Sequence, residues 1–408
     1  MSRNTKLSIA LFGLALVLRL ITLMFVLPKL RPDVDLDSYH SLAKSLAAGK
    51  GFVAVAPNGH ELPNVARTPV YPLFLAGLVR VGGDRVGVFL AMQCVLGALT
   101  CALTVVLAAR WLRPQVSILA GLLVAIDPNS VLRCSDLRTE TVFTLLIVAG
   151  ACLIAWHPNK KRGWFATGLL WSLAALTRPI AIWIWMVALV IILARRCSWR
   201  DTAACLAAFL IGYFPLEGVW AARNHALTGR YFISTISTYN LMFRAVGIKA
   251  GAKGQTQEDA EREFCARYGD IQFVESREQF AHSLREYQRV IGEELFSAPG
   301  ILAKQAVLGC GKLLLGPGVH ALDNSLGQTE TSSKWWPLVY SAVLLAAALL
   351  SLIGVKRLGW EALVPALLLL YFVGLSSGPE SNSRFRVPIT PLLAVLATAG
   401  AYGMEKRK

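Results

Sequence analysis

Long apolar segments constrain this chain more than any other feature of its sequence. A helix needs about 20 apolar residues to cross about 30 Å of hydrocarbon, and runs of this kind recur along the 408 residues. Hydrophobic residues make up 55% of the chain and charged residues only 16%, against about 25% charged in an average soluble domain. This composition argues against a soluble protein and excludes intrinsic disorder as its main state.

Ten membrane-spanning segments are predicted from these runs and their flanks. Their ranges are 7–28, 86–109, 114–131, 140–156, 164–178, 179–194, 203–221, 336–354, 359–376 and 387–403. Tight hairpins are expected at Pro114 and Pro179, because proline disrupts the interior of a helix. Arg3 and Lys6 precede the first run, which lacks a small-residue cleavage site, so an uncleaved first span is predicted.

The basic residues agree with this topology, because short cytoplasmic loops of membrane proteins are rich in Lys and Arg. With the N-terminus inside, the inside segments carry Arg3, Lys6, Arg110, Arg113, Lys160, Lys161, Arg162, Arg195, Arg196, Arg200, Lys356, Arg357, Lys406, Arg407 and Lys408. An even number of spans returns the C-terminus to the same side. Most of the formal charge of +16 therefore reports topology and does not predict a nucleic-acid partner.

Two long segments outside the predicted spans divide the chain into three parts. Residues 1–221 form an N-terminal transmembrane module, whose first outer loop covers residues 29–85. Residues 222–335 form an extracytoplasmic segment, and residues 336–408 hold the C-terminal transmembrane helices. The two outer segments are where chemistry is expected.

Amphipathic helices are predicted within the second outer segment. One begins at Thr256, and another is expected to end at Pro299. The second helix places apolar side chains at helical spacing on one face, at Phe280, Leu284, Tyr287, Ile291 and Leu295. The apolar run 301–315 contains two lysines and would break the charge pattern as a span, so it is predicted to be interfacial or re-entrant.

Three carboxylates follow the first span within five residues, at Asp33, Asp35 and Asp37. One interpretation is a helix cap, in which Asp37 or Ser38 begins the helix that runs through Leu42. The other is that one aspartate acts as a general base, because a carboxylate can accept the proton of an attacking hydroxyl. Both interpretations stay open at this point.

Arginines recur where the predicted outer loops meet the membrane. They are Arg67, Arg178, Arg223, Arg384 and Arg386. Any one of them could be an interfacial anchor, since arginine keeps its charged end in water while its stem lies along apolar surface. The positive-inside rule disfavours all five. A guanidinium binds phosphate in a forked geometry, so together they predict an anionic, lipid-linked ligand.

Glu140 begins the fourth predicted span, on the same membrane face as Asp35. An acid at a helix N-terminus is often only a favourable partner of the helix dipole. A site of paired carboxylates is the alternative hypothesis for these two residues.

Six motifs, in order along nearly the whole chain, resemble one family. They are Asp35-x-x-x-Tyr39, Arg67-x-Pro69-x-Tyr71-Pro72, Thr139-Glu140, Leu176-Thr177-Arg178-Pro179, Arg223-Asn224 with Tyr239-Asn240, and Ser383-Arg384-Phe385-Arg386-Val387-Pro388. The chain is similar to bacterial GT-C membrane glycosyltransferases (glycosyltransferase family 39-like) related to the protein O-mannosyltransferases and the aminoarabinose transferase of lipid A. The resemblance implies an all-α polytopic membrane protein of GT-C-type fold, with 10 to 12 transmembrane helices and two long extracytoplasmic loops that carry short helices.

The resemblance also implies the substrates and the location. The donor is a sugar linked to polyprenyl phosphate, and the acceptor is an envelope lipid, glycan or protein on the outer side. The expected location is the bacterial inner membrane, with both termini cytoplasmic and the site extracytoplasmic. By motif register the family's first-loop aspartate falls on Asp35, with Asp37 as the nearby rival.

A departure from the family concerns the cofactor. Some relatives carry a Glu-Lys pair where this chain has Ala66-Arg67. Arg67 is then expected to take the phosphate role of the lysine, and the missing glutamate weakens the case for a bound metal. No metal ligand is assigned, and a divalent cation stays open as the one cofactor to consider.

The expected reaction is an inverting transfer, in which an acceptor hydroxyl attacks the anomeric carbon and polyprenyl phosphate leaves. Asp35 is the predicted base, and Glu140 orients the acceptor or shares the proton. The five arginines above are the candidates for holding the phosphate. The sugar site has four candidate residues, each of which could instead be structural: Tyr39, Tyr71, Tyr239 and Asn240.

Three other classes of protein are the alternatives to a glycosyltransferase. A transporter or flippase for lipid-linked glycans would show internal repeats and charged residues at mid-membrane, whereas Arg19 is the one clear case here. A polysaccharide polymerase or ligase would place its long loop among the later spans. A non-catalytic scaffold would leave the repeated Arg and Asp placements without a reason.

Overall fold

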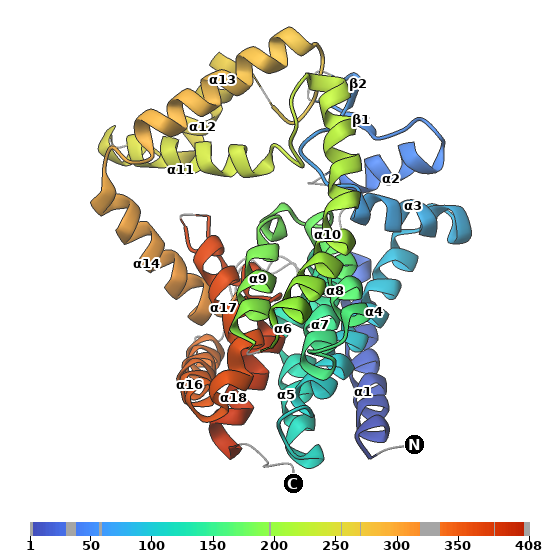
Figure 1. Cartoon of the computed structure of the whole chain (residues 1–408). Helices are drawn as coiled ribbons and strands as arrows, with labels where there is room; N and C mark the ends of the chain where they lie inside the picture. The colour runs from blue at the N-terminus through green and yellow to red at the C-terminus, as the bar shows by residue number, and fades with distance from the viewer. Residues whose placement is uncertain are drawn as a thin grey trace.

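The computed structural model describes residues 3–29, 38–56, 59–195, 197–253, 255–269, 271–318, 335–378 and 380–403. Apart from one short β-hairpin, the regular structure of these residues is helical. Long helices form a body, and a separate layer of helices lies over the end of the body that is opposite to the start of α1 (Figure 1).

Among the described residues, eleven helices build the body. They are α1 (Arg3–Val26), α4 (Val86–Ala108), α5 (Pro114–Ile126), α6 (Pro128–Leu132), α7 (Glu140–Trp156), α8 (Lys161–Ala175), α9 (Ile184–Ala194), α10 (Trp199–Thr228), α16 (Trp335–Leu358), α17 (Leu363–Ser376) and α18 (Thr390–Tyr402). Short 3-10 turns join some of them: η2 (Arg133–Ser135), η3 (Pro179–Ala181), η4 (Gly359–Ala362) and η5 (Ser383–Arg386).

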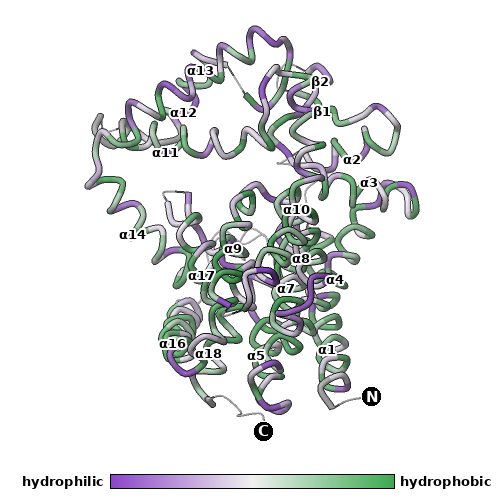
Figure 2. The backbone as a smooth tube through the Cα atoms, in the orientation of Figure 1, coloured by the Kyte–Doolittle hydropathy of each residue, from purple (hydrophilic) through white to green (hydrophobic). Residues whose placement is uncertain are grey.

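The outer layer comes from the two predicted outer segments. The first supplies α2 (Tyr39–Ala47), the antiparallel strands β1 (Val53–Val55) and β2 (Glu61–Pro63), and α3 (Val70–Gly82). The second supplies α11 (Ile236–Lys253), α12 (Gln257–Tyr268), α13 (Arg277–Glu294) and α14 (Pro299–Leu315). Figure 2 shows the body as largely hydrophobic, whereas α12 and α13 carry many hydrophilic residues.

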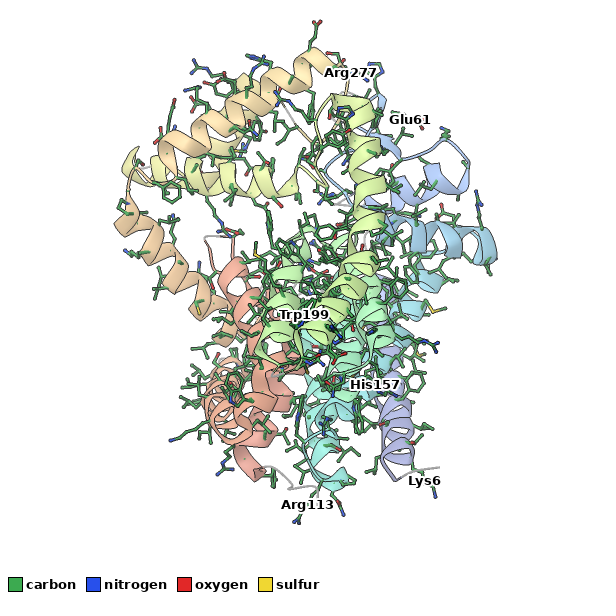
Figure 3. All side chains as sticks on the ribbon, in the orientation of Figure 1. Lys6, Glu61, Arg113, His157, Trp199 and Arg277 are labelled. Atoms are coloured by element: carbon green, nitrogen blue, oxygen red, sulfur yellow. The ribbon has the colours of Figure 1, made fainter. Side chains whose placement is uncertain are left out.

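Several helices satisfy the requirements of a membrane span. By length and composition, α1, α4, α10 and α16 are long and apolar enough, and the bent pair α5 with 128–135 is a fifth candidate in the described part of the chain. Shorter apolar helices occupy most of the other predicted spans. Charged residues mark the two ends: Lys6 and Arg113 lie at one end and Glu61 and Arg277 at the other (Figure 3). The count of ten spans stays a prediction.

The predicted span 114–131 is wrong as one continuous helix, because the chain bends by 60° between α5 and α6. Pro128 cannot donate the amide hydrogen that would continue α5. The side chain of Asp127 instead caps α6, accepting a hydrogen bond from the backbone nitrogen of Ser130 at 2.8 Å. The buried Arg19 donates to the carbonyl oxygens of Val124 and Ala125 at the end of α5, so the break leaves these groups satisfied.

Glycines allow the body helices to cross closely. A Cβ at Gly168 of α8 would collide with the carbonyl oxygen of Phe209 of α10, and one at Gly212 of α10 would collide with that of Phe165. The same reciprocal arrangement joins α16 and α18. Small residues at helix crossings are the usual packing device inside membranes, so these crossings hold the body together.

The second outer segment folds largely as its sequence pattern predicts. Thr256 is the N-cap of α12, and its side chain accepts a hydrogen bond from the backbone nitrogen of Asp259. Phe280 and Tyr287 of α13 are buried against α11 and α12. Pro299 does not end α13, which stops at Glu294. It begins α14, where a proline fits the first helical turn.

Candidate functional site

A buried carboxylate is the centre of the candidate site. Glu140 is the first residue of α7, and its side chain is fully buried. Its Oε1 lies 2.7 Å from Nη1 of Arg178 and also accepts a hydrogen bond from Nε of Arg384. Its Oε2 is buried with no hydrogen-bond partner among the described residues. Two guanidiniums around one carboxylate give this cluster a net positive charge.

Aromatic rings hold the two guanidiniums in place. The guanidinium carbon of Arg178 lies 5.8 Å from the ring centre of Phe143 and 5.5 Å from that of Phe385. The guanidinium carbon of Arg384 lies 5.7 Å from the same Phe385 ring. Such contacts attract a cation to the face of a ring. The side chains of Arg178 and Arg384 stay 13% and 25% exposed, so a ligand can reach them although it cannot reach Glu140.

The turn that carries Arg178 is fixed from two other helices. Pro179 follows Arg178 and opens η3. Tyr371 of α17 donates a hydrogen bond to the carbonyl oxygen of Ile180, and Tyr213 of α10 donates to that of Ile182 at 2.8 Å. These two tyrosines therefore determine where the turn, and with it Arg178, lies above the body.

This support from Tyr213 and Tyr371 was not predicted from the sequence. One turn after Tyr213 lies Glu217, which is 5% exposed and whose Oε1 has no hydrogen-bond partner among the described residues. Tyr213 and Glu217 lie four residues apart inside an apolar run. This pair could have indicated a functional position, because intramembrane ionisable residues are rare and mark such positions.

Arg386 has a different environment from Arg384. Its side chain is fully buried and donates to the carbonyl oxygens of Leu313 at 3.0 Å and Gly316 at 2.8 Å. These groups end α14, so Arg386 acts as a cap for that helix. Tyr340 of α16, which receives a hydrogen bond from Arg386, itself donates to Asp127. The structure thus gives Arg386 partners within the protein.

Arg223 joins the end of α10 to the first outer loop. Its guanidinium donates to the carbonyl oxygen of Asn64 at 2.8 Å and to that of Phe52 at 3.2 Å. Its guanidinium carbon also lies 4.7 Å from the ring centre of Trp220. Both terminal nitrogens of Arg223 are therefore engaged by the protein itself.

Arg67 lies in the first outer loop, apart from the other candidate arginines. The backbone nitrogen of Arg67 donates to Oδ1 of Asn64 at 2.8 Å, and its guanidinium carbon lies 5.4 Å from the ring centre of Tyr39. The rings of Tyr39 and Tyr71 meet edge to face at 5.0 Å. Tyr71 is buried and donates to Oε1 of Gln93, which indicates a structural role for its hydroxyl.

The predicted base lies outside the described residues, as do Asp33 and Asp37. The chain is described again from Ser38, which is the N-cap of α2 with φ +60°. Asp35 precedes Tyr39 by four residues, and Tyr39 contacts Arg67. The position of Asp35 therefore stays a prediction, although its place in the sequence is close to Tyr39, which contacts Arg67.

Two residues predicted for the sugar site lie on α11. Tyr239 donates a hydrogen bond to Glu261 of α12, and Asn240 is exposed. Within the described part of the chain, no hydrogen bond joins either of them to Glu140. The described part of the chain also contains no group of three or more His, Cys, Asp or Glu that could hold a metal ion. The acids of the first outer loop at Asp33, Asp35 and Asp37 lie outside that part.

Residues 66–220 match the family model described as dolichyl-phosphate-mannose-protein mannosyltransferase. This segment covers less than half of the chain and contains Arg67, Glu140 and Arg178. No curated protein matches the chain by sequence.

Solved structures give the fold. Archaeal oligosaccharyltransferase AglB from Archaeoglobus fulgidus, in complex with an inhibitory peptide and a dolichol-phosphate, is similar over 95% of this chain and 50% of its own, with a TM-score of 0.52 and 12% identity. ArnT from Cupriavidus metallidurans, bound to undecaprenyl phosphate, is similar over 96% of this chain and 78% of its own, with a TM-score of 0.44 and 15% identity. This chain spans about half the length of AglB. The family match over residues 66–220 bears out the resemblance to protein mannosyltransferases, and the likeness to AglB is one of fold.

Proposed function

We propose that this chain transfers a sugar from a polyprenyl-phosphate donor to an acceptor on the extracytoplasmic side of a bacterial inner membrane. The acceptor is an envelope lipid, a glycan or a protein. The observation that carries the proposal is the pair of partly exposed arginines, Arg178 and Arg384, held around one buried carboxylate. The family description and the dolichol-phosphate bound to AglB support a lipid-phosphate donor.

The two arginines would bind the departing phosphate. As the bond from the anomeric carbon to the phosphate oxygen breaks, negative charge grows on that phosphate. Guanidiniums already oriented toward this charge stabilise the transition state more than the ground state. Phosphate is a good leaving group, so no acid of the kind found in glycosidases is needed.

Glu140 takes a different role here from the one its sequence position suggested. Its carboxylate is fully buried, forms an ion pair with Arg178 and accepts a hydrogen bond from Arg384. We therefore assign it the orientation of those arginines and not contact with the acceptor. Removing one partner of a buried ion pair strands a charge, which makes the three residues interdependent.

The acceptor needs a base, and Asp35 is proposed for it, with Asp37 as the alternative. The acceptor oxygen bonds to the anomeric carbon from the face opposite the phosphate, its proton passes to the aspartate, and polyprenyl phosphate leaves with the electron pair. The configuration at the anomeric carbon is therefore inverted. Arg67, next to the ring of Tyr39, is the proposed third phosphate contact.

The orientation in the membrane follows the charge pattern. We propose ten spans with both termini cytoplasmic, so that Lys6 and Arg113 lie on the cytoplasmic side and the outer layer with Glu61 and Arg277 lies outside (Figure 3). The cluster of Glu140, Arg178 and Arg384 then faces the outer leaflet. Of the predicted sugar-site residues, Tyr39 is retained as a candidate because its ring lies beside Arg67.

The test is a comparison of envelope lipids, glycans and proteins from cells with and without this chain, by mass spectrometry. One missing sugar unit in one of these classes is the expected result. Purified protein in proteoliposomes should also release polyprenyl phosphate from a polyprenyl-phosphate sugar in the presence of the acceptor so identified. A flippase would instead move the intact lipid-linked sugar across the bilayer with no release, and that outcome would replace the proposal.

A further inference from the structure

A cavity of about 470 Å³ lies between the turn that follows α4 and the helices α7, α9 and α17, away from the site around Glu140. Its walls include apolar side chains of three helices, at Ile154, Ile191 and Val364. Two arginines, Arg110 and Arg195, also line it. The volume lies within the usual range of ligand sites, about 300–1,000 Å³.

The protein holds each arginine through one nitrogen of its guanidinium, and the other two nitrogens can make a bidentate contact with an anionic ligand. Arg110 donates from Nε to the carbonyl oxygen of Ala155 at 2.9 Å, and a bidentate contact through the two terminal nitrogens does not need that atom. Arg195 donates to Oδ1 of Asn159 from one terminal nitrogen, Nη2, and its guanidinium carbon lies 5.6 Å from the ring centre of Trp164. The two guanidiniums are therefore positioned before any ligand arrives.

The charge of the lining is of one sign. None of the described side chains that line the cavity is an Asp or a Glu. Two fixed cations beside an apolar wall match a ligand with an anionic head and a hydrocarbon tail. Trp360, which is 73% exposed, also lines the cavity, and exposed tryptophans are typical of the interface between membrane and water.

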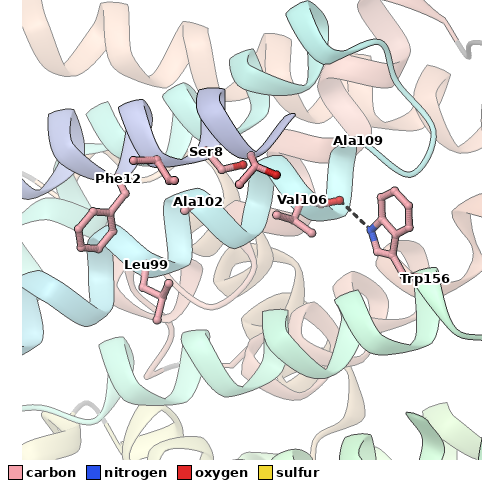
Figure 4. A pocket seen from close by; sticks show the side chains of 9 residues that line it. Ser8, Phe12, Leu99, Ala102, Val106, Ala109 and Trp156 are labelled. Atoms are coloured by element: carbon pink, nitrogen blue, oxygen red, sulfur yellow. Dashed lines mark hydrogen bonds between the residues drawn. The ribbon is translucent and has the colours of Figure 1, made fainter. Parts of the chain in front are cut away.

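A second cavity of similar size has no charged residue in its described lining, which shows that the two arginines distinguish the first. It has about 450 Å³ and lies between α1, α4 and α7, lined by residues such as Phe12, Leu99 and Trp156 (Figure 4). Thr5 and Ser8 are its most polar residues, and no charged side chain is among its described lining. Hydrocarbon alone would suit this second cavity, whereas the first offers positive charge as well.

We propose that the cavity between Arg110 and Arg195 binds one anionic glycerophospholipid of the leaflet that faces the short basic loops. The guanidiniums hold the headgroup phosphate, as basic pockets between transmembrane helices do, and the first carbons of an acyl chain lie against Ile154, Ile191 and Val364. This site does not depend on the proposed glycosyl transfer. It is a lipid site at the end of the body opposite the outer layer.

Native mass spectrometry of the protein, released from nanodiscs of phosphatidylcholine with phosphatidylglycerol, tests the proposal. The wild-type chain is expected to retain one phosphatidylglycerol in preference to phosphatidylcholine. The double variant Arg110→Gln/Arg195→Gln should lose that preference at least tenfold. Ala194→Trp keeps both arginines but fills part of the cavity, so it should also lower retention and serves if the double variant folds poorly.

The matched control is Arg200→Gln, because Arg200 is an exposed arginine of α10 that does not line the cavity. It should retain phosphatidylglycerol as the wild type does. Equal retention by the wild type and both cavity variants would overturn the proposal, and so would equal loss in the control. Retention of polyprenyl phosphate but not of phosphatidylglycerol, in nanodiscs that contain both, would overturn the assignment to a glycerophospholipid.

Discussion

The hydroxyl of Tyr371 lies 2.5 Å from the carbonyl oxygen of Ile180, two residues beyond Arg178 in the chain. This bond joins α17, near the C-terminal end, to the turn that presents a proposed phosphate ligand. Tyr371 also meets Phe372 edge to face at 5.1 Å, and Phe372 meets Phe143 at 5.6 Å. The guanidinium of Arg178 is thus supported from α17 by one hydrogen bond and one row of rings.

Tyr371→Phe should lower the rate of sugar transfer about fivefold, because it removes one hydrogen bond worth about 1 kcal/mol from the turn that positions Arg178. The rings stay in place, so the protein should remain folded. Steady-state kinetics in proteoliposomes measure the effect, and Tyr402→Phe, an exposed tyrosine at the end of α18, is the control. An unchanged rate would mean that the turn is held without this bond.

Arg178→Ala and Arg384→Ala should each lower the transfer rate by about 10²–10³, the usual loss when one group that stabilises developing charge is removed. Arg178→Lys should recover only part of the rate, since lysine cannot make a bidentate contact. Arg285→Ala, on an exposed part of α13, is the matched control. If Arg178→Ala and Arg178→Lys both bound the donor as tightly as the wild type, Arg178 would not belong to the phosphate site.

Glu140→Ala should destabilise the protein by about 3–5 kcal/mol, because it leaves two partly buried guanidiniums without their shared carboxylate. Thermal unfolding in detergent measures this loss. In a double-mutant cycle, Glu140→Ala/Arg178→Ala should be less destabilised than the sum of the single variants, since the two residues are in direct contact. Strict additivity would contradict the interdependence proposed for this cluster.

Asp35→Asn should abolish transfer while insertion into the membrane and donor binding remain normal, because an amide cannot accept the proton of the acceptor. Asp37→Asn should retain most of the activity. Single-turnover assays with a labelled donor separate binding from transfer. If both variants transfer sugar at the wild-type rate, the base is not in the first outer loop.

Arg386→Ala should reduce stability by about 1–3 kcal/mol, because the carbonyl oxygens at the end of α14 lose their donor. Donor affinity per folded molecule should change little. Thermal unfolding and donor binding, measured on the same preparation, distinguish this from a phosphate role. A variant that is fully stable but binds the donor weakly would restore Arg386 to the phosphate site.

Much of the fold could be predicted from the sequence because its signals are local. Apolar runs, Thr256 as a cap and the apolar face with Phe280 and Tyr287 all depend on neighbours within a few turns. The short strands β1 and β2 were not predicted, since three residues each carry almost no periodic signal. Pro128 follows Asp127 and is a sequence signal for the break, but the apolar run 114–131 favoured the prediction of one continuous span.

The roles of the arginines could not be told apart in the same way. Arg384 and Arg386 are two residues apart, yet the first pairs with Glu140 and the second caps α14. The difference depends on which helix packs beside η5, and that contact is distant in sequence. Sequence position could identify arginines at the helix ends, whereas tertiary packing decides which of them stay available to a ligand.

The helix α10 is long enough to connect the membrane-spanning body to the outer layer. Its 30 residues span about 45 Å at about 1.5 Å per residue, whereas the hydrocarbon core is about 30 Å thick. The helix continues without interruption past Pro215 to Thr228, and Arg223 in its last turns is hydrogen-bonded to the first outer loop. A thinner or thicker bilayer would change the tilt of a helix of this length, and the outer layer bonded to it would change its height above the membrane surface. Under the proposed transfer, lipid composition would therefore change how far from the bilayer surface the acceptor is bound.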